Sequence, residues 1–382
     1  MERRRPLLIV AGMLMVFLLA AACQAAPTPT PEPTQTPSPA PTRVPPTATP
    51  TPTATPEPQM VLASDGALVP EESNEPLPPL APGVNPLTGL PVDADTLRHR
   101  PILVRYGNDT AARPPYGLAA ADVIFEELAE GGFVTRITGA YLTTLPDTVG
   151  PIRSARPAVI DMLQQLDASL VYGGASNGTQ GLLNRQPYPL YSHVGNGANL
   201  FYRMAGRPSP HNLFIHLPDL RQRMVTDQQD YPVKLGGWAF SPTAPAGTPV
   251  THIHIPYPGE APVDYTYSAA SGAYLRNVQG APHMDGLYRK QLAPANVVVL
   301  YLEHKNSNIV EDSLGNVAIL VNWFGTGRAQ VFRDGFMIDA TWQRNAAHQL
   351  TRLKDANGND IPLKPGRTWI EIVPTNYEVT VK

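Results

Sequence analysis

The chain has 382 residues, enough for two or three domains, and its 29 Lys and Arg residues nearly balance 32 Asp and Glu residues, for a net charge of −3. It therefore lacks the basic excess that neutralises a phosphate backbone, and nucleic acid is not an expected partner. The single cysteine, Cys23, excludes an internal disulfide and a cysteine-based zinc site, and we expect no cofactor and no resident metal.

Residues 1–22 have the layout of a bacterial export signal. Arginines at 3–5 precede an apolar run at 7–19, and alanines at 20–22 supply the small residues that a signal peptidase needs. Cys23 follows directly, as in a lipobox, so we predict a signal peptide at 1–22 and an acylated Cys23 as the mature N-terminus. Acylation would anchor the chain to the extracytoplasmic face of the cell membrane. An uncleaved anchor and a signal cleaved without lipidation are the alternatives.

Residues 23–84 are predicted to be the lipidated cysteine and a disordered Pro/Thr-rich tether. Residues 24–58 are almost wholly Pro, Thr, Ala and Ser, with no apolar periodicity that could offset the entropy of ordering. Proline favours polyproline II, which rises ~3.1 Å per residue and gives a reach on the order of 100 Å. A passive spacer is the favoured interpretation, and a ligand for a proline-binding domain is the alternative. Thr and Ser beside Pro are also candidate sites of O-glycosylation.

The next part of the sequence, residues 85–235, predicts an α/β domain with a mixed sheet. Short apolar runs predict strands at 101–106, 121–128, 133–145 and 170–172. Behind Pro157, apolar residues recur at i, i+3, i+4 and i+7, which predicts one face of a helix formed by Val159, Met162, Leu163 and Leu166. A second helix is predicted at 217–224. This alternation of strands and helices indicates an α/β unit.

The amino-acid composition and the predicted secondary structure change in the second half of the chain. Residues 236–250 are rich in Gly, Pro and Ala and predict a linker, and residues 251–382 predict a mainly β domain. Its strands are expected at 252–255, 264–276 (a hairpin), 296–302, 317–321, 329–332 and 369–373, with a tight turn at Asn357-Gly358. The predicted class is α+β: an N-terminal α/β domain with a mixed sheet, followed by a mainly β C-terminal domain.

The segment GPIRSARP, at 150–157, is the candidate anion site. It places Arg153 and Arg156 at a loop-to-helix junction, where two guanidinium forks and the free N–H groups of a helix start could bind an anion. The alternative is a set of internal ion pairs, with Asp122, Glu126 or Glu130 as partners. Further candidate ligand-binding residues lie in later loops and are Asn177, Arg203, His211 and Asn212.

Glu126 and Glu130 are the candidate acid/base residues. Two carboxylates ~5–9.5 Å apart across a cleft could act on a glycosidic bond. On a strand Glu126 and Glu127 face opposite sides, so only one of them could join such a site. Solvated or arginine-paired acids are the alternative. The sequence contains no HExxH, GxSxG or phosphate-loop motif, so enzymatic activity is left open and is not the favoured interpretation.

Several segments resemble the YerB-like bacterial lipoproteins, a family of unknown function with two conserved domains. The likeness covers about residues 85–375 and is most specific in GPIRSARP (150–157) and PHNL (210–213). Further matching segments are NPLTG (85–89), EGG (130–132), GGAS (173–176), GTGRAQVFRDG (325–335) and PGRTW (365–369). The resemblance implies a lipoprotein with two domains, and it supplies neither an activity nor catalytic residues.

Functions of different classes follow from these features. The favoured one is a membrane-anchored, non-catalytic module that binds a cell-envelope polymer or an envelope protein. It would use the arginine loop and C-terminal aromatic residues, which could stack on sugars or belong to the core: Trp323, Trp342 and Trp369. The alternative is a hydrolase or transferase on an anionic envelope glycan, with the arginines as anion ligands and Glu126 or Glu130 as acid/base. A small-solute receptor is the third option.

Overall fold

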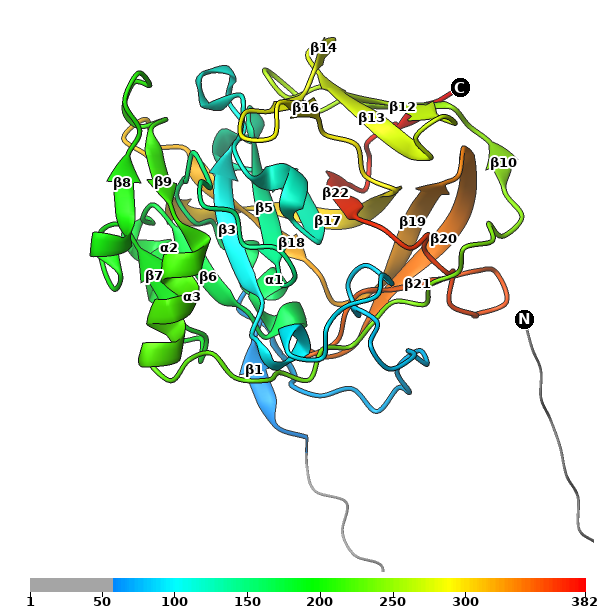
Figure 1. Ribbon diagram of the computed structural model, residues 1–382, viewed down its shortest axis with the longest axis horizontal. Coiled ribbons are helices and arrows are strands. Elements are labelled where there is room, and N and C mark those ends of the chain that lie inside the picture. Colours follow the sequence, from blue (N-terminus) through cyan, green and yellow to red (C-terminus); the bar gives the residue numbers. More distant parts are fainter. Residues whose placement is uncertain (1–57) are drawn as a thin grey trace, which may run out of the picture. The chain divides into compact units, whose positions relative to one another are not determined.

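The computed structural model describes residues 58–382, whose path is shown in Figure 1. The predicted signal peptide, the lipidation site Cys23 and tether residues 24–57 lie outside the described residues. Within residues 58–382, none of the helices has both the length and the apolar character needed to cross a membrane. The same part of the chain contains no group of three or more His, Cys, Asp or Glu residues that could hold a metal ion.

A mixed sheet of 12 strands forms the body of the fold. In chain order its strands are β3 (Ile102–Gly107), β4 (Val123–Leu128), β5 (Thr135–Tyr141), β6 (Ser169–Tyr172), β7 (Leu190–Ser192), β10 (Thr248–Pro249), β17 (Asn296–Val310), β18 (Val317–Asn322), β19 (Gly325–Arg333), β20 (Phe336–Arg344), β21 (Arg352–Lys354) and β22 (Thr368–Pro374). Their spatial order is β10-β20-β19-β17-β22-β4-β5-β3-β6-β7, with β18 beside β17 and β21 beside β20.

Smaller elements surround this sheet. An antiparallel sheet of five strands contains β11 (His252–Ile255), β12 (Val263–Ser268), β13 (Ala273–Val278), β14 (Ala281–Pro282) and β23 (Thr380–Val381). Three strand pairs are β1 (Met60–Leu62) with β2 (Leu68–Pro70), β8 (Phe201–Arg203) with β9 (Leu213–Ile215), and β15 (Met284–Asp285) with β16 (Lys290–Gln291). The helices are α1 (Val159–Leu166), α2 (Asn177–Leu183) and α3 (Leu217–Thr226), and short 3-10 turns cover 96–98, 110–112, 118–120, 130–132 and 198–200.

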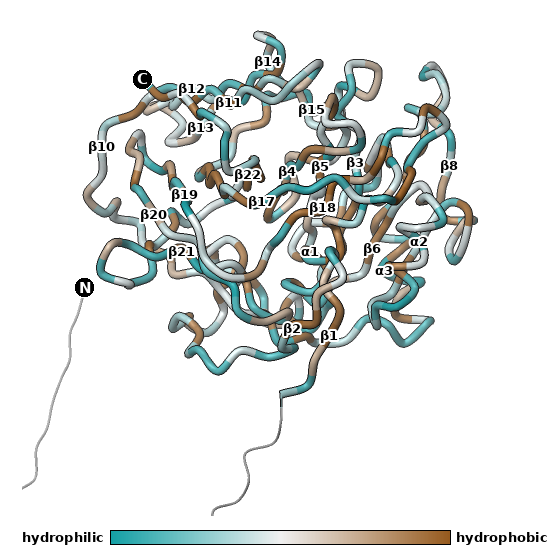
Figure 2. The backbone as a smooth tube through the Cα atoms, turned by 180° about the vertical axis from the view of Figure 1, so that it is seen from behind, coloured by the Kyte–Doolittle hydropathy of each residue, from teal (hydrophilic) through white to brown (hydrophobic). Residues whose placement is uncertain are grey.

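Two hydrophobic cores pack against the 12-stranded sheet. One core joins its strands to α3 and the five-stranded sheet, through residues such as Leu217, Tyr265 and Trp369. The other core joins them to α1, through residues such as Phe125 and Val159. Figure 2 shows hydrophobic colour along interior strands such as β3, β5 and β6. The sheet is therefore a central layer that is covered on both faces.

The C-terminal strand β22 joins the two halves of the chain into one sheet. It pairs in parallel with β17 on one side and with β4 on the other, with Thr368 opposite Val123. In Figure 1 it is the red strand beside β17, in the middle of the molecule. The predicted class, α+β with a mainly β C-terminal half, is confirmed. The segment predicted as a linker, 236–250, is not free, because Trp238 is buried and donates a hydrogen bond to the Thr351 carbonyl at 2.9 Å.

The structure differs from the prediction at the end of the tether. Residues 58–84 were expected to continue the disordered segment, but strands β1 and β2 form there and bury Ala63 and Val69. The Leu62 carbonyl accepts a hydrogen bond from Gln164 of α1 at 2.7 Å. These contacts give the backbone groups of β1 and β2 their hydrogen-bond partners. They could not be predicted from a sequence segment that is rich in proline and polar residues. The tether therefore ends before β1.

Helix α1 has the apolar face that its periodicity predicts, and its polar face is buried as well. Asp161 is fully buried and its carboxylate lies 3.0 Å from Arg344 of β20. Burial raises the pKa of Asp161, and the charge of Arg344 opposes that change. The helix thus connects the N-terminal half to the C-terminal half. The second helix, α2, was not predicted, because Gly178 and Gly181 lower helix propensity in its seven residues.

Candidate functional site

The candidate site lies at the carboxyl ends of parallel strands. Strands β3, β6 and β7 pair in parallel, and β4 runs in the same direction because both β3 and β4 are antiparallel to β5. In open α/β sheets, ligands bind outside these strand ends. The GPIRSARP segment crosses this edge, where the Arg153 amide donates to the Arg105 carbonyl at 2.9 Å. The local fold therefore brings the arginine loop to the edge where a ligand site is expected.

Arg156 is bound by carboxylates of the protein itself. Its Nε lies 2.6 Å from Glu130 Oε2, and its Nη1 lies 3.3 Å from Glu311 Oε2. Glu311 follows β17 in the turn of the β17–β18 hairpin, and its other carboxylate oxygen accepts a hydrogen bond from Thr179. Of the two interpretations of Arg156, the internal ion pair is therefore the one that the geometry supports. One of its two carboxylate partners, Glu311, is supplied by the C-terminal half of the chain.

Glu130 bridges two arginines and is not free to exchange a proton at neutral pH. Its carboxylate lies 2.8 Å from Arg136 Nη2 and 2.6 Å from Arg156 Nε. Burial acts to raise the pKa of Glu130, but the charge of Arg136 and the hydrogen bond from Arg156 outweigh it and lower the pKa to about 2. A carboxyl group that is ionised and occupied in this way does not serve as a general acid near pH 7.

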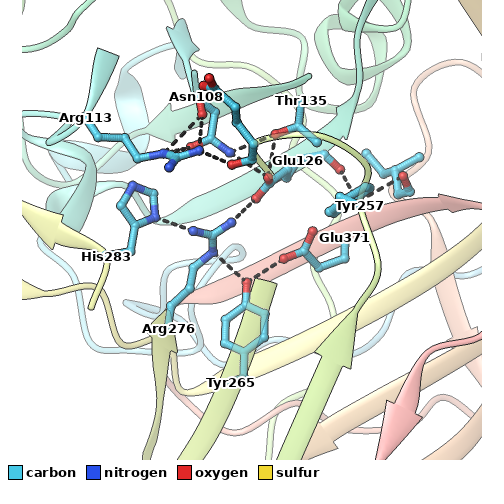
Figure 3. A network of polar contacts seen from close by, with 11 residues as sticks. Asn108, Arg113, Glu126, Thr135, Tyr257, Tyr265, Arg276, His283 and Glu371 are labelled. Carbon is cyan, nitrogen blue, oxygen red and sulfur yellow. Dashed lines mark hydrogen bonds and ion pairs between the residues drawn. The ribbon is translucent and has the colours of Figure 1, made fainter. Parts of the chain in front are cut away.

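Glu126 is fully buried beneath the five-stranded sheet. Its carboxylate accepts hydrogen bonds from Asn108 at 2.9 Å, from Thr135 at 2.7 Å and from Arg276 at 2.5 Å, as Figure 3 shows. Glu127 lies on the opposite face of β4, as predicted, and pairs with Arg105 at 2.6 Å. Glu126 and Glu130 therefore do not meet across an open cleft, and neither position supports their predicted acid/base role.

A second carboxyl group joins the buried network around Arg276. Glu371 of β22 lies opposite Glu126 in the register and accepts a hydrogen bond from Tyr265 at 2.6 Å, and Arg276 Nε donates to the same Tyr265 hydroxyl at 3.2 Å (Figure 3). Burial, with the charge of Glu126, raises the pKa of Glu371 to about 8. Arg276 also lies 4.3 Å above the Trp369 ring. This network connects the five-stranded sheet to the 12-stranded sheet.

Arg153 differs from the arginines around it. Within residues 58–382 it joins no ion pair, and its half-buried side chain has an Nε that lacks a hydrogen-bond acceptor. Gly107 makes room for it, because a Cβ on Gly107 would meet Arg153 Cγ at 2.6 Å. Arg153 lies near Arg136 and His211, since its charge contributes to lowering the pKa of each. One cation at the strand ends thus remains without a neutralising partner in the described part of the chain.

The other predicted ligand residues lie in the β8–β9 hairpin and at the start of α2. His211 Nδ1 lies 3.0 Å from Asp109, and burial lowers the pKa of His211 against the opposing charge of that carboxylate. Arg203 is exposed and donates to the Asn212 side chain at 2.8 Å. The hairpin reaches the arginine loop through the Ile152 amide and the Leu213 carbonyl, which are 2.7 Å apart.

Asn177 is neither hydrogen-bonded nor ion-paired to this group in the described residues. It is the first residue of α2 and is exposed, and in the described residues no hydrogen bond or ion pair links it to the arginine loop. The aromatic residues proposed for sugar stacking are also unavailable, because Trp323, Trp342 and Trp369 are all buried in the cores. The structure thus brings together Arg153, His211, Asn212 and Arg203, and in the described residues Asn177 makes no hydrogen bond or ion pair with any of them.

Comparisons with known proteins match both halves of the folded part of this chain. One family model, the N-terminal domain of the DUF3048 proteins of unknown function, matches residues 87–231, and the C-terminal domain of DUF3048 matches residues 253–370. The chain belongs to this two-domain family. A relative is YerB of Bacillus subtilis (strain 168), which is named as a lipoprotein and is 28% identical over 296 residues, or 76% of this chain and 86% of YerB.

The fold of the family has also been seen in a crystal. The crystal structure of the Bacillus subtilis YerB protein matches this chain with a TM-score of 0.68 and 25% sequence identity, over 78% of this chain and 99% of that one. The match covers nearly the whole YerB chain of that structure. The two-domain family predicted from GPIRSARP and PHNL is therefore confirmed, and no activity comes with it.

Sequence reasoning missed the residues that neutralise the site. Glu311 lies 155 residues beyond Arg156, so nothing local in the sequence connects the two. A weaker signal existed for Arg105 and Glu371, which are single charges inside the apolar runs PILVRY and TWIEIV. Charged residues are almost never fully buried unless they are paired, so a charge within a core strand predicts a buried partner. For Glu371 that signal could have identified the network in Figure 3, and for Arg105 the ion pair with Glu127.

Proposed function

We propose that this chain is a lipoprotein, anchored at Cys23 to the extracytoplasmic face of the cell membrane, whose folded part binds an anionic polymer of the cell envelope. The anchor is supported by the signal-like layout of residues 1–23 and by the relative YerB, which is named as a lipoprotein. The Pro/Thr-rich segment that follows would hold the folded part at a distance from the membrane. The binding site is the carboxyl edge of β3 and β6, around Arg153.

The observation that carries the proposal is the unbalanced charge of Arg153. The neighbouring arginines each have a carboxylate of the protein, with Glu127 on Arg105, and Glu130 on both Arg136 and Arg156. Arg153 has none within residues 58–382. A guanidinium binds carboxylate and phosphate groups in bidentate fashion, so Arg153 is suited to an anionic group from outside. The exposed Arg203 and the half-buried Asn212 would extend this contact along a repeating polymer.

A catalytic function receives less support from the site. The acid/base alternative requires two available carboxyl groups near the scissile bond. Glu126 is buried and held by three hydrogen bonds, and Glu130 is held by two arginines. Binding without turnover is therefore the function that these positions favour.

The proposal is tested by binding of the full-length chain, kept in detergent, to purified cell-wall material that carries its anionic polymers. We expect Arg153→Ala to weaken retention roughly 10-fold or more, as for loss of a charged hydrogen bond. Retention of the unmodified chain should fall as salt rises, because exposed charges are screened. Arg185→Ala is the matched control, since Arg185 is an exposed arginine just after α2.

Two results would contradict the proposal. The first is an absence of retention on wall material with and without its anionic polymers. The second is an equal loss in Arg153→Ala and Arg185→Ala, which would show only a general effect of charge. If an envelope protein co-purified with the chain while wall material did not bind, the partner would be a protein and the polymer would be excluded.

A further inference from the structure

A pair of pockets lies at the opposite edge of the sheet from Arg153, near the amino ends of β4 and β22. The smaller pocket has a volume of about 100 Å³ and is bordered by Ile124, Lys290, Arg367 and Trp369, among others. Lys290 belongs to β16, and Arg367 immediately precedes β22. The pocket therefore uses residues from both halves of the chain, at the edge of the space between the two sheets.

The charged side chains that line this small pocket are donors, and Gln291 adds a neutral amide. Arg367 Nε is buried without a hydrogen-bond acceptor, and so is Trp369 Nε1, within the part of the chain that the structure describes. Lys290 adds an exposed ammonium group, and no Asp or Glu is among the residues that line the pocket. An unmade hydrogen bond at a buried donor costs free energy, which an oxyanion in the pocket would recover.

Most charged groups near the small pocket have partners that explain their positions, and the exposed Asp93 lines only the larger neighbouring pocket. Arg276, which packs over Trp369, is bound to Glu126 at 2.5 Å. Asp285 accepts hydrogen bonds from the backbone N–H groups of residues 117, 119, 287 and 288. The two acids Glu126 and Asp285 are therefore not available to neutralise Arg367. The two unsatisfied donors therefore point to a ligand from outside the chain.

A larger pocket of about 440 Å³ adjoins the small one, and Arg367 lines both. Its wall carries the threonines Thr88, Thr96 and Thr143, whose hydroxyl groups can bind a hydroxylated molecule. Asp122 also lines it, but both of its carboxylate oxygens already accept hydrogen bonds, from Asn85 and from the Leu142 and Thr143 region. The larger pocket thus suits the polar body of a ligand.

We infer that these pockets bind a small hydroxylated molecule that carries one oxyanion group, either a carboxylate or a phosphate. The oxyanion occupies the 100 Å³ pocket, where it accepts hydrogen bonds from the guanidinium of Arg367 beside the Trp369 ring, with Lys290 at the rim. The hydroxylated body lies along the threonines of the 440 Å³ pocket. This site is separate from Arg153, which lies at the other end of the strands. The proposal for one site can therefore fail without affecting the proposal for the other.

The indole N–H of Trp369 allows a direct test by nuclear magnetic resonance. The chain has four tryptophans, so the indole region of a ¹H–¹⁵N spectrum of the full-length protein in detergent is simple. Trp369→Phe assigns the signal. We expect inorganic phosphate or acetate, at matched ionic strength, to shift the Trp369 signal saturably, and chloride not to do so. The Trp238 and Trp342 signals should stay in place, since both N–H groups already donate to backbone carbonyls.

Arg367→Gln should weaken this binding roughly 10- to 100-fold, the range for losing a charged hydrogen bond. Arg289→Gln is the control, because it removes an equal charge from an exposed position beside Lys290. Glycerol 3-phosphate should bind more tightly than inorganic phosphate if its hydroxyl groups reach the threonines. Phosphate and acetate tested separately show which oxyanion is preferred.

The inference is overturned if no oxyanion moves the Trp369 signal of the unmodified protein, a result that needs no variant to fold. It is also overturned if chloride acts equally, or if Arg367→Gln and Arg289→Gln weaken binding alike. Equal affinities for phosphate and glycerol 3-phosphate would show that the larger pocket does not bind the hydroxylated part of the ligand. If Arg367→Gln lost the dispersed spectrum of a folded protein, Arg367→Lys, which keeps the charge but not the planar fork, would replace it and should bind more weakly.

Discussion

Glu126 and Glu371 are register partners on adjacent parallel strands, and both carboxyl groups are fully buried beside a single guanidinium, that of Arg276. Arg276 bonds directly to Glu126 and reaches Glu371 through the Tyr265 hydroxyl. Burial and the nearby charge of Glu126 raise the pKa of Glu371 to about 8, because the single charge of Arg276 does not offset both effects.

This arrangement predicts that the protein loses stability as the pH rises through neutrality. The folded-state pKa of Glu371, about 8, lies above the unfolded value of roughly 4.3, so the folded protein binds one more proton between these limits. The free energy of unfolding should therefore fall from about pH 5 to pH 8. Glu371→Gln, which imitates the protonated form, should flatten this slope and leave the protein more stable than the parent at pH 9.

Chemical denaturation of both proteins at pH 6 and pH 9 checks this expectation. At pH 6 the two midpoints should be close, because Glu371 is protonated in the parent. A Glu371→Gln protein that is destabilised equally at both values would show that the carboxylate is ionised in the folded state. The network would then need a second cation.

The pH dependence of Glu130 has the opposite sign. Its folded pKa of about 2 lies below the unfolded value, so its contribution is present above pH ~4.5 and is lost as the pH falls toward 2. Glu130→Gln should lower the free energy of unfolding at pH 7 by roughly 2–3 kcal/mol. The difference from the parent should shrink below pH 3, and a difference that stays constant with pH would count against the paired geometry.

Glu311 fixes the tip of the β17–β18 hairpin to the N-terminal half through Arg156 and Thr179. Glu311→Ala should cost about 1–3 kcal/mol, because Arg156 loses one of its two carboxylates. Hydrogen exchange should become faster in residues 303–317, and retention on anionic wall material should rise as Arg156 becomes available. Glu303→Ala is the control: its exposed pair with Lys305 belongs to the class that contributes ~0–1 kcal/mol. Equal exchange in both variants would argue against the contact.

The membrane anchor makes a separate prediction. Cys23→Ser should move the protein from the membrane fraction of cells to the soluble extracytoplasmic fraction, and the intact mass should lose its acyl chains. Thr30→Ser, a change within the tether, should leave both properties unchanged. Retention of Met1 in the mass of the unmodified protein would contradict cleavage before Cys23.

Patterns of short range in the sequence predicted the local elements well. The i, i+3, i+4, i+7 spacing from Val159 to Leu166 predicted α1, and the apolar run from 296 to 302 predicted the first half of β17. The parallel pairing of β22 with β4 could not be predicted, because it joins residues about 245 positions apart and depends on packing of the whole sheet. The second half of β17 is polar and exposed, so no apolar pattern marks it.

In the candidate site, too, the local features could be predicted from the sequence and the long-range contacts could not. The sequence located the arginine loop and offered Glu130 as an internal partner, which the structure places 2.6 Å from Arg156. The sequence could not show which of Arg153 and Arg156 is paired, because the two arginines are only three positions apart in the same motif. The distinction comes from Glu130 and from Glu311 of a distant hairpin, both of which pair with Arg156 and not with Arg153.

The position of β22 has a consequence for how the protein is made. A polypeptide leaves the ribosome, and an export channel, with its N-terminus first, yet β4 finds one of its neighbours only in residues 368–374. Until that segment emerges, β4 presents a bare row of amide and carbonyl groups, the feature by which unfinished chains aggregate. A product truncated before residue 368 would keep that edge permanently and be an early substrate for quality-control proteases.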